Sequence, residues 1–199
     1  MTDITSLRER RRLATSAEIE AAAFELFAER GSEHTTVDDI AAAAGVSPRT
    51  FFRYFPTKED AVLGVKRDFY AAVSEHMFPR ADDPGGAAAV GLGELAGATA
   101  AALDSFGAAA RERMVRVRCL CEQDANLRHR SLLLDAEQCR LRQDQIGGSH
   151  PRLLVESLNV ALTAALDDWA IRSAAGEDAD LVEVFRTTCD VQRQLFSTR

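Results

Sequence analysis

The sequence predicts an all-α protein, for three reasons. Apolar residues recur at spacings of three and four through most of the chain, as they do along one face of an amphipathic helix. Ser or Thr followed three residues later by Asp or Glu marks several helix starts, and glycines mark several ends. The chain has only five prolines, and no run of β-branched residues indicates a strand. We expect about nine helices, grouped as a three-helix head and a larger helical region.

The first predicted helix starts at Thr15, which forms a capping box with Glu18, and ends at Gly31. Its apolar stripe can close a small core with the two helices that follow. Residues 1–14 are expected to be a flexible or extended basic arm, because four arginines gather there: Arg8, Arg10, Arg11 and Arg12. Such an arm can contact DNA in the minor groove or remain solvated surface, and both alternatives stay open.

Two short helices joined by a tight turn are predicted next. Thr36 can cap the first, with Asp39 as its capping partner, and Gly45 stands where that helix must end in a left-handed conformation. Ser47 can cap the second, with Pro48 at its first helical position. This arrangement indicates a helix-turn-helix.

In a helix-turn-helix the second helix lies in the major groove of DNA. Phe51 and Phe55 can anchor that helix to the core, which leaves Arg49 and Thr50 to reach base edges. Tyr54 and Lys58 are suited to phosphates, and Lys58 falls in the first turn of a helix capped by Thr57. The predicted DNA-binding residues are Thr36, Ser47, Pro48, Arg49, Thr50, Phe52, Arg53, Tyr54 and Lys58.

Residues from about Thr15 to Leu63 resemble the TetR family of ligand-responsive transcriptional regulators. The resemblance depends on the Gly45-Val46-Ser47 turn, the aromatic and basic segment 51–55, and the exit Pro56-Thr57-Lys58-Glu59. One departure concerns position 52, which is commonly a phosphate-binding tyrosine in this family. Because Phe52 has no hydroxyl group, we assign the aromatic phosphate contact to Tyr54.

Further helices are predicted beyond the head. One runs from Thr57 to about His76 and is the only obvious mechanical connection between the head and the rest; Pro79 and residues 82–86 then interrupt the pattern. The others span about 87–104, 108–121, 124–146, 151–176 and 178–195. We divide the chain into a DNA-binding domain, residues 1–60, and a C-terminal helical ligand-binding and dimerisation domain, residues 61–199.

The resemblance implies that the last two helices form a four-helix interface in a homodimer, which suits a palindromic operator. It also implies an effector pocket in the C-terminal domain. Candidate lining residues are large or amide-bearing: Phe69, Phe78, Phe106, Met114, Leu120, Asn126, Asn159 and Trp169. Each can equally be ordinary core, since aromatic residues at helical spacing usually pack against their neighbours.

Composition and motifs exclude several other classes of protein. The net charge of −7 argues against a protein that coats nucleic acid, although basic residues cluster locally. No membrane span or secretion signal is present, so we expect a cytoplasmic protein whose cysteines 119, 121, 139 and 189 are free thiols. No catalytic, metal-binding or phosphate-loop spacing appears, so neither an enzyme nor a cofactor is expected.

The sequence thus predicts a DNA-binding repressor released by a small, largely apolar effector. Two alternatives remain at this point. The first is a DNA-binding regulator that has no small-molecule effector. The second is a helical enzyme that merely resembles a regulator at its N-terminus.

Overall fold

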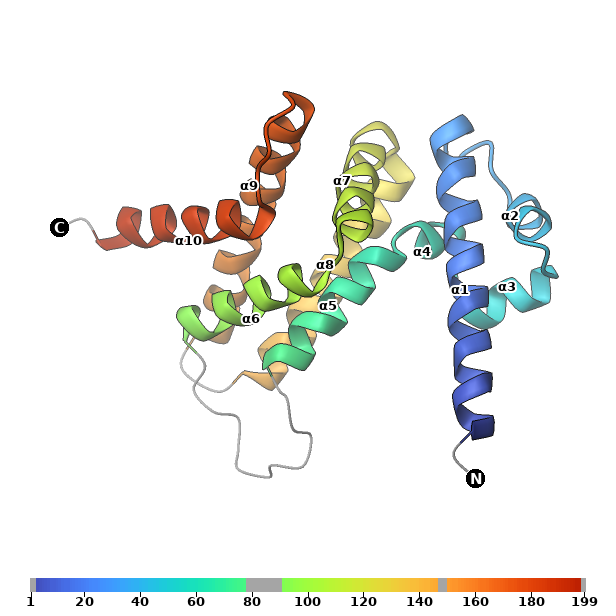
Figure 1. Cartoon of the computed structure of the whole chain (residues 1–199), viewed down its shortest axis with the longest axis horizontal. Coiled ribbons are helices and arrows are strands. Elements are labelled where there is room, and N and C mark those ends of the chain that lie inside the picture. The colour runs from blue at the N-terminus through green and yellow to red at the C-terminus, as the bar shows by residue number, and fades with distance from the viewer. Residues whose placement is uncertain (1–2, 78–90, 147–149, 198–199) are drawn as a thin grey trace. The chain divides into compact units, whose positions relative to one another are not determined.

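The computed structural model describes residues 3–77, 91–146 and 150–197 (Figure 1). Within those ranges the chain forms ten α-helices and no strand, which confirms the all-α prediction. The helices are α1 (Asp3–Arg30), α2 (Val37–Ala43), α3 (Pro48–Tyr54), α4 (Lys58–Val62), α5 (Gly64–Met77), α6 (Leu92–Ser105), α7 (Ala108–Gln123), α8 (Ala125–Gln145), α9 (Pro151–Ala174) and α10 (Leu181–Ser197).

The helices group into two compact units. The head unit comprises Met1–Lys66 and Arg116–Leu133, and the second unit comprises Arg67–Val115 and Leu134–Arg199. Helices α5, α7 and α8 therefore each have residues in both units. The division at residue 60 that we drew from the sequence stays a prediction.

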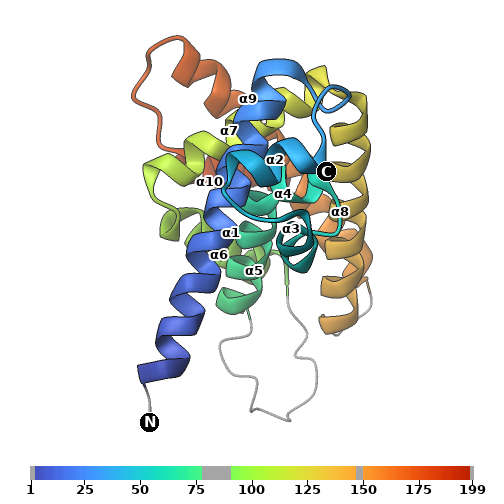
Figure 2. The same ribbon diagram turned by 90° about the vertical axis from the view of Figure 1, so that its right-hand side faces the viewer.

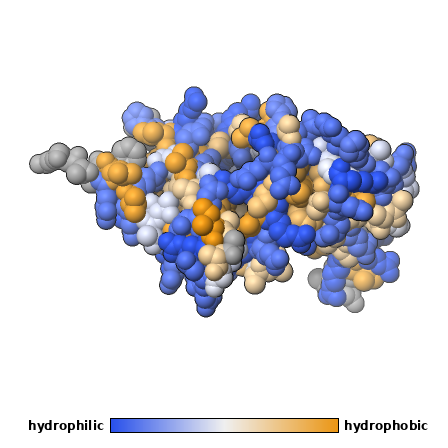
Figure 3. Space-filling model, turned by 90° about the horizontal axis from the view of Figure 1, so that it is seen from above, coloured by the Kyte–Doolittle hydropathy of each residue, from blue (hydrophilic) through white to orange (hydrophobic). Residues whose placement is uncertain are grey.

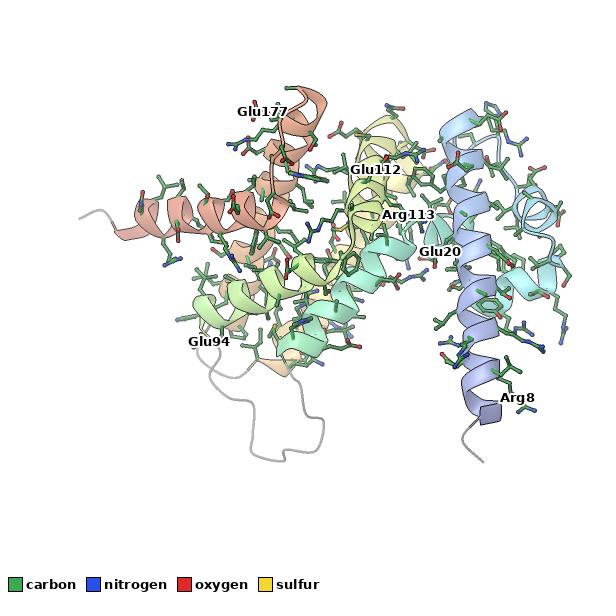
Figure 4. The ribbon with its side chains drawn as sticks, viewed as in Figure 1. Arg8, Glu20, Glu94, Glu112, Arg113 and Glu177 are labelled. Atoms are coloured by element: carbon green, nitrogen blue, oxygen red, sulfur yellow. The ribbon has the colours of Figure 1, made fainter. Side chains whose placement is uncertain are left out.

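Helix α1 is longer than predicted. It begins at Asp3, so residues 3–14 are helical rather than an extended arm, and Thr15 lies inside the helix instead of capping it. The segment 3–14 contains no proline or glycine and is rich in good helix formers. An ion pair between Arg12 and Glu9, 2.7 Å apart and three residues apart, adds to this preference. Figure 4 shows Arg8 near the start of the helix.

The capping predictions for the next two helices are confirmed. The Thr36 side chain accepts a hydrogen bond from the Asp39 amide, and the Asp39 carboxylate accepts one from the Thr36 amide, which completes a capping box at the start of α2. Gly45 has φ of +66°, the left-handed conformation that the turn requires. Ser47 caps α3, and Pro48 is its first residue.

The predicted helix from Thr57 to His76 is two helices, which accounts for ten helices rather than nine. Thr57 caps α4 as expected, but the helix ends at Val62 and is followed by Leu63, whose side chain is fully buried. Gly64 then begins α5 against the α1 residue Glu20, whose side chain Figure 4 labels. A Cβ atom at Gly64 would lie 2.4 Å from the Glu20 Cδ, so a larger residue there would displace that carboxylate.

The core of the head unit is apolar and comes from each of its short helices. Figures 1 and 2 show α1 running beside α2, α3 and α4. The largest buried side chains in this core include Ile19, Phe27, Ile40, Phe51, Phe55 and Leu63. Burying this apolar surface is what holds helices of five to seven residues, which are too short to be stable alone.

In the second unit α10 packs against α9 and α6. Its core includes Leu95, Leu103, Val155, Ala165, Leu181 and Phe185. The predicted helices 108–121, 124–146 and 151–176 agree with α7, α8 and α9 within three residues at each end. Helix α10 starts later than predicted, because Asp180 accepts hydrogen bonds from the Val182 and Glu183 amides and so caps it there.

Some sequence predictions fall outside the described residues. These are the start of the helix at residue 87, the breaks at Pro79 and residues 82–86, the pocket candidate Phe78 and the break at residues 147–149. In the part of the chain that is described, no helix is both long enough and apolar enough to cross a membrane.

Candidate nucleic-acid interface

Helix α3 is held to the head unit through two phenylalanines. The Phe51 side chain is fully buried and that of Phe55 is 2% exposed, as the four-residue spacing predicted. At its start, the Ser47 side-chain oxygen accepts a hydrogen bond from the Thr50 amide at 3.1 Å. These contacts determine the rotation of α3 about its axis, and therefore which side chains point outward.

The opposite face of α3 is open to solvent. Arg49 and Arg53 are exposed, and the Phe52 side chain is 57% exposed. The Arg53 guanidinium lies over the Tyr54 ring, 5.1 Å from its centroid. Ser47 and Pro48 are exposed as well, while Thr50 and Tyr54 are half-buried. The structure thus brings seven of the nine predicted DNA-binding residues onto α3 and its cap.

Thr36 lies at the start of α2, where its polar atoms already have partners. Its hydroxyl donates to the Asp39 carboxylate at 2.7 Å and accepts from the Asp39 amide at 3.1 Å. Arg30 forms an ion pair with the same carboxylate at 3.1 Å. Hydrogen bonds from Thr36, with the nearby charge of Arg30, hold the pKa of Asp39 below its usual range. Thr36 is exposed, so its outer surface remains accessible.

Lys58 has a structural role that the sequence did not predict. Its ammonium group donates hydrogen bonds to the backbone carbonyls of Ser32 and Thr35, the latter at 2.9 Å. It therefore closes the turn between α1 and α2. A lysine has three donor hydrogens, so a phosphate contact by Lys58 stays a prediction alongside this turn-closing role.

Residues of α8, far along the chain, contact α4 within the head unit. Arg130 of α8 forms an ion pair with Asp60 of α4, with both its Nε and Nη2 2.9 Å from the Asp60 Oδ1, and the Asp60 side chain is only 1% exposed. The Thr57 hydroxyl donates to the other oxygen of that carboxylate at 2.9 Å. A buried carboxylate needs such partners, because an unpaired charge in the interior is strongly unfavourable.

The start of α8 is tied to the turn after α1. One oxygen of Asp124 accepts from the Leu127 amide at 2.9 Å and caps α8, while the other accepts from the Ser32 amide at 2.7 Å. Burial alone would raise the pKa of Asp124, but these hydrogen bonds lower it below the usual value. Two further contacts within the head unit join α5 to α8 and α7 to α1: Lys66 donates to the Ser131 hydroxyl at 2.7 Å, and Arg116 lies over the Phe24 ring.

Sequence reasoning missed this polar support because its partners are 65 to 92 residues apart. A single clue existed in the sequence. Asp60 stands directly before the apolar run Ala61-Val62-Leu63, where a carboxylate is expected to be buried and to need a cation. The sequence does not say which arginine supplies that charge.

The predicted pocket residues are distributed over both units. In the second unit the Phe69 and Phe106 rings pack edge to face with centroids 6.0 Å apart, and Met114 is buried. Asn159 and Trp169 are half-buried; the Asn159 side-chain amide donates to the Cys139 sulfur at 2.7 Å and the Trp169 indole to the Ala179 carbonyl at 2.8 Å. Leu120 and Asn126 belong to the head unit. A shared pocket for all seven stays a prediction.

Two surface depressions of the second unit were candidates for that pocket. One of about 420 Å³ is lined by mostly polar residues at the end of α9 and along α10. The other, of about 380 Å³, lies between α6 and α10 and includes Gly93, Gly97 and Phe185. None of the predicted pocket residues lines either depression.

Metal binding finds no support among the described residues, since no three His, Cys, Asp or Glu side chains there converge on one point. The four cysteines are free thiols. Cys139 and Cys189 are buried, Cys121 is half-buried and Cys119 is exposed.

Part of the head unit is similar in sequence to known bacterial regulators. Residues 19–64 match the model of bacterial regulatory proteins of the tetR family. The HTH-type transcriptional regulator TcmR of Streptomyces glaucescens is 49% identical over 57 residues, which are 29% of this chain and 25% of TcmR. The transcriptional regulator MftR of Mycobacterium tuberculosis is 51% identical over 49 residues, 25% of each chain. The chain thus spans about a quarter of the length of these relatives.

A solved structure is similar over a longer range at lower identity. The fatty acid degradation regulator FadR from Bacillus halodurans is 19% identical, with 93% of this chain and 97% of that chain covered and a TM-score of 0.49. The family match itself includes α2, α3, α4 and every predicted DNA-binding residue, from Thr36 to Lys58. It confirms the resemblance seen in the sequence: residues 19–64 are similar to bacterial regulatory proteins of the tetR family.

Proposed function

We propose that this protein is a ligand-responsive transcriptional repressor that binds palindromic operator DNA as a homodimer. One observation carries the proposal. Helix α3 presents Arg49 to solvent while Phe51 and Phe55 hold the helix down, within a segment that matches a family of regulators. In this position an arginine can make a forked contact to guanine in the major groove.

The homodimer is proposed from the surface of the last two helices. Large apolar side chains stand exposed there: Leu153, Val160 and Ile171 on α9, and Val191 and Leu195 on α10, each at least half exposed. Figure 3 shows hydrophobic surface over α10 beside the grey C-terminal residues. On α9 the three residues are spaced seven and eleven apart, which places them along one face of the helix. An exposed apolar face of this kind supports an interaction site, and a second copy of α9 and α10 is the partner that an operator palindrome requires.

The proposed mechanism is a shift between two conformations. An effector that binds the second unit better in one conformation favours that conformation, and this shift releases DNA if the recognition helices are then wrongly spaced. The sequence suggested a single connection to the head. Two more candidates exist, because α7 and α8 also have residues in both units, and their connecting segment is hydrogen-bonded within the head unit.

Footprinting of the purified protein on its own upstream region tests DNA binding directly. We expect protection of a palindrome whose half-sites are about one helical turn apart. Absence of any protected palindrome at low salt would contradict the proposal. Release of that DNA by a small molecule that also raises the melting temperature would separate a ligand-responsive repressor from a regulator without an effector.

The dimer interface is tested with a charge on α9. Val160→Glu is expected to shift the protein from dimer to monomer in light scattering and to weaken operator binding. Leu141→Glu is the matched control, because Leu141 is also an exposed aliphatic residue but lies on α8. A dimer that survives Val160→Glu as well as the control would place the interface elsewhere.

A further inference from the structure

Arg142 of α8 is a buried cation whose charge is only partly compensated. Its residue surface is 4% exposed, and its Nε and Nη2 atoms have no hydrogen-bond partner among the described residues. Burying donor groups without partners costs free energy, most of all on a charged group, so proteins rarely retain them without a reason. Such an arrangement is expected where a ligand supplies the missing acceptors.

The groups around Arg142 are committed to other partners. Its guanidinium lies over the Tyr70 ring, 4.5 Å from the centroid, and the Tyr70 hydroxyl donates to Asp135 at 2.5 Å. The Cys139 sulfur accepts a hydrogen bond from Asn159. Burial lowers the pKa of Arg142, although the neighbouring Tyr70, Cys139 and Asp135 oppose that shift. Asp135 is thus close enough to interact electrostatically with Arg142, yet Nε and Nη2 donate no hydrogen bond to it.

The two unused nitrogens define the shape of the missing ligand group. Nε and Nη2 lie on the same side of the planar guanidinium, so their N–H bonds point in parallel from one edge. Two parallel donors match the two oxygens of one carboxylate. A dianionic group fits less well, because Asp135 would repel the second charge.

A row of packed aromatic side chains leads away from Arg142 through Tyr70. The Tyr70 ring contacts the Phe69 ring with centroids 5.8 Å apart, and the Phe69 ring contacts that of Phe106 at 6.0 Å. Phe69 and Phe106 are among the pocket residues predicted from the sequence. An acid bound by Arg142 would therefore have aromatic side chains beside its carbon skeleton.

We propose that Arg142 binds the carboxylate of an organic acid with an apolar body, and that this acid is the effector class of the protein. The inference rests on the proposed function, because it names the ligand of the second unit. It also adds a charge to the largely apolar effector expected from the sequence. Arg142 supplies the fork that orients the acid, and the Tyr70, Phe69 and Phe106 rings supply apolar contact.

The test uses the full chain and defined probes: decanoate and 4-phenylbutyrate, each beside its methyl ester. Binding is followed by the melting temperature and by the fluorescence of Trp169, the single tryptophan. We expect an acid to bind, its ester to bind at least about tenfold more weakly, and Arg142→Met to weaken acid binding by about 10- to 100-fold. Arg140→Met, an exposed arginine on the same helix, should bind the acid like the natural protein.

Two further measurements keep the test decisive. Arg142→Lys retains the positive charge but loses the two parallel N–H donors, so this variant should also bind the acid at least about tenfold more weakly. If Arg142→Met does not fold, the acid affinity of Arg142→Lys tests the proposal in its place. Arg142→Met itself should melt no lower than the natural protein, since it removes a buried cation that lacks partners.

Three results would overturn the proposal: equal binding of acid and ester, undiminished acid binding by the Arg142 variants, or binding of neither acid. Footprinting on the same samples separates this failure from that of the proposed function. A protected operator that no acid releases leaves the regulator intact and removes the role of Arg142. Loss of the operator footprint in the natural protein removes the regulator and leaves the binding result to stand on its own.

Discussion

The two units differ in whether their buried charged side chains have hydrogen-bond partners among the described residues. In the head unit the buried carboxylate of Asp60 is paired with Arg130, and Asp124 accepts two backbone amides. In the second unit two nitrogens of Arg142 have no hydrogen-bond partner within the part of the chain that the structure describes. Fully paired buried groups fix one arrangement of the segments that carry them, whereas the two nitrogens of Arg142 are where we propose that a carboxylate binds. The head is thus built to hold a shape.

The units also differ in how their helices start. The three short helices of the head are each capped by a hydroxyl side chain, from Thr36, Ser47 and Thr57. The long helix α9 begins without any side-chain cap and is held by packing against α10. A helix of five to seven residues needs its cap because so few internal hydrogen bonds offset the cost of nucleation. The short helices of the head therefore depend on their caps more than α9 does.

The largest expected effect tests the anchoring of α3. Phe51→Ala should lower the free energy of unfolding by about 3–5 kcal/mol, since it opens a cavity in the head core. Phe52→Ala is the matched control: its ring is 57% exposed, and the loss should stay below about 1 kcal/mol. Urea denaturation measures both. Equal losses would mean that α3 is rotated from the orientation that presents Arg49 outward.

The buried ion pair comes next. Arg130→Met should destabilise the protein by about 3 kcal/mol in urea denaturation, because the buried Asp60 carboxylate then lacks its cation. Arg186→Met removes an exposed arginine from α10 and should change stability by less than about 0.5 kcal/mol. The double variant Asp60→Leu/Arg130→Met should recover part of the loss. A single variant as stable as the control would show that the head does not depend on this pair.

DNA recognition by Arg49 is expected to be specific to one base. Arg49→Ala should weaken operator binding by about 1–3 kcal/mol and relax the preference at a single base position, without changing the melting temperature. Affinity measured on a set of operators, each altered at one position, checks this. A uniform loss over all the operators would make Arg49 a phosphate contact instead.

Some of the features behind these predictions could be predicted from the sequence, and others could not. Three features of the head could be predicted from residues within four positions of one another. They are the capping box at Thr36, the left-handed conformation of Gly45 and the burial of Phe51 and Phe55. The same local reasoning failed at Thr15, where a capping box lies inside a continuous helix. Helix propensity over residues 3–14 outweighed the cap signal there.

The rest depends on long-range contacts that no local pattern encodes. The sequence placed Lys58 on a phosphate from its position in a first turn, whereas the structure directs its ammonium group to two carbonyls about 25 residues earlier. The sequence offered no reason to choose Arg142 among the arginines of α8, because its burial follows from helix packing. The exposure of the candidate residues on α3 was therefore predictable from the sequence, whereas the burial of Arg142 in the second unit was not.

A substitution of Lys58 distinguishes its two roles, the phosphate contact predicted from the sequence and the turn-closing contacts seen in the structure. Lys58→Met should lower stability by about 1–2 kcal/mol, because the carbonyls of Ser32 and Thr35 lose a charged donor. If Lys58 also contacts a phosphate, the slope of log affinity against log salt should become shallower by about 1. An unchanged slope together with lower stability would leave Lys58 as a turn-closing residue only.

The smallest expected effect concerns Asp124 and depends on pH. At neutral pH Asp124→Ala should cost about 1 kcal/mol, because α8 loses its cap and the Ser32 amide loses its acceptor. The pKa of Asp124 is lowered in the folded protein, so the stabilisation is complete above the unfolded pKa of about 4 and disappears as the pH falls through the lower folded value. The stability difference between natural protein and variant should therefore shrink below about pH 4. Asp144→Ala, an exposed aspartate on the same helix, is the control. A difference that stays constant from pH 7 to pH 3 would mean that the carboxylate charge does not hold α8 to the head.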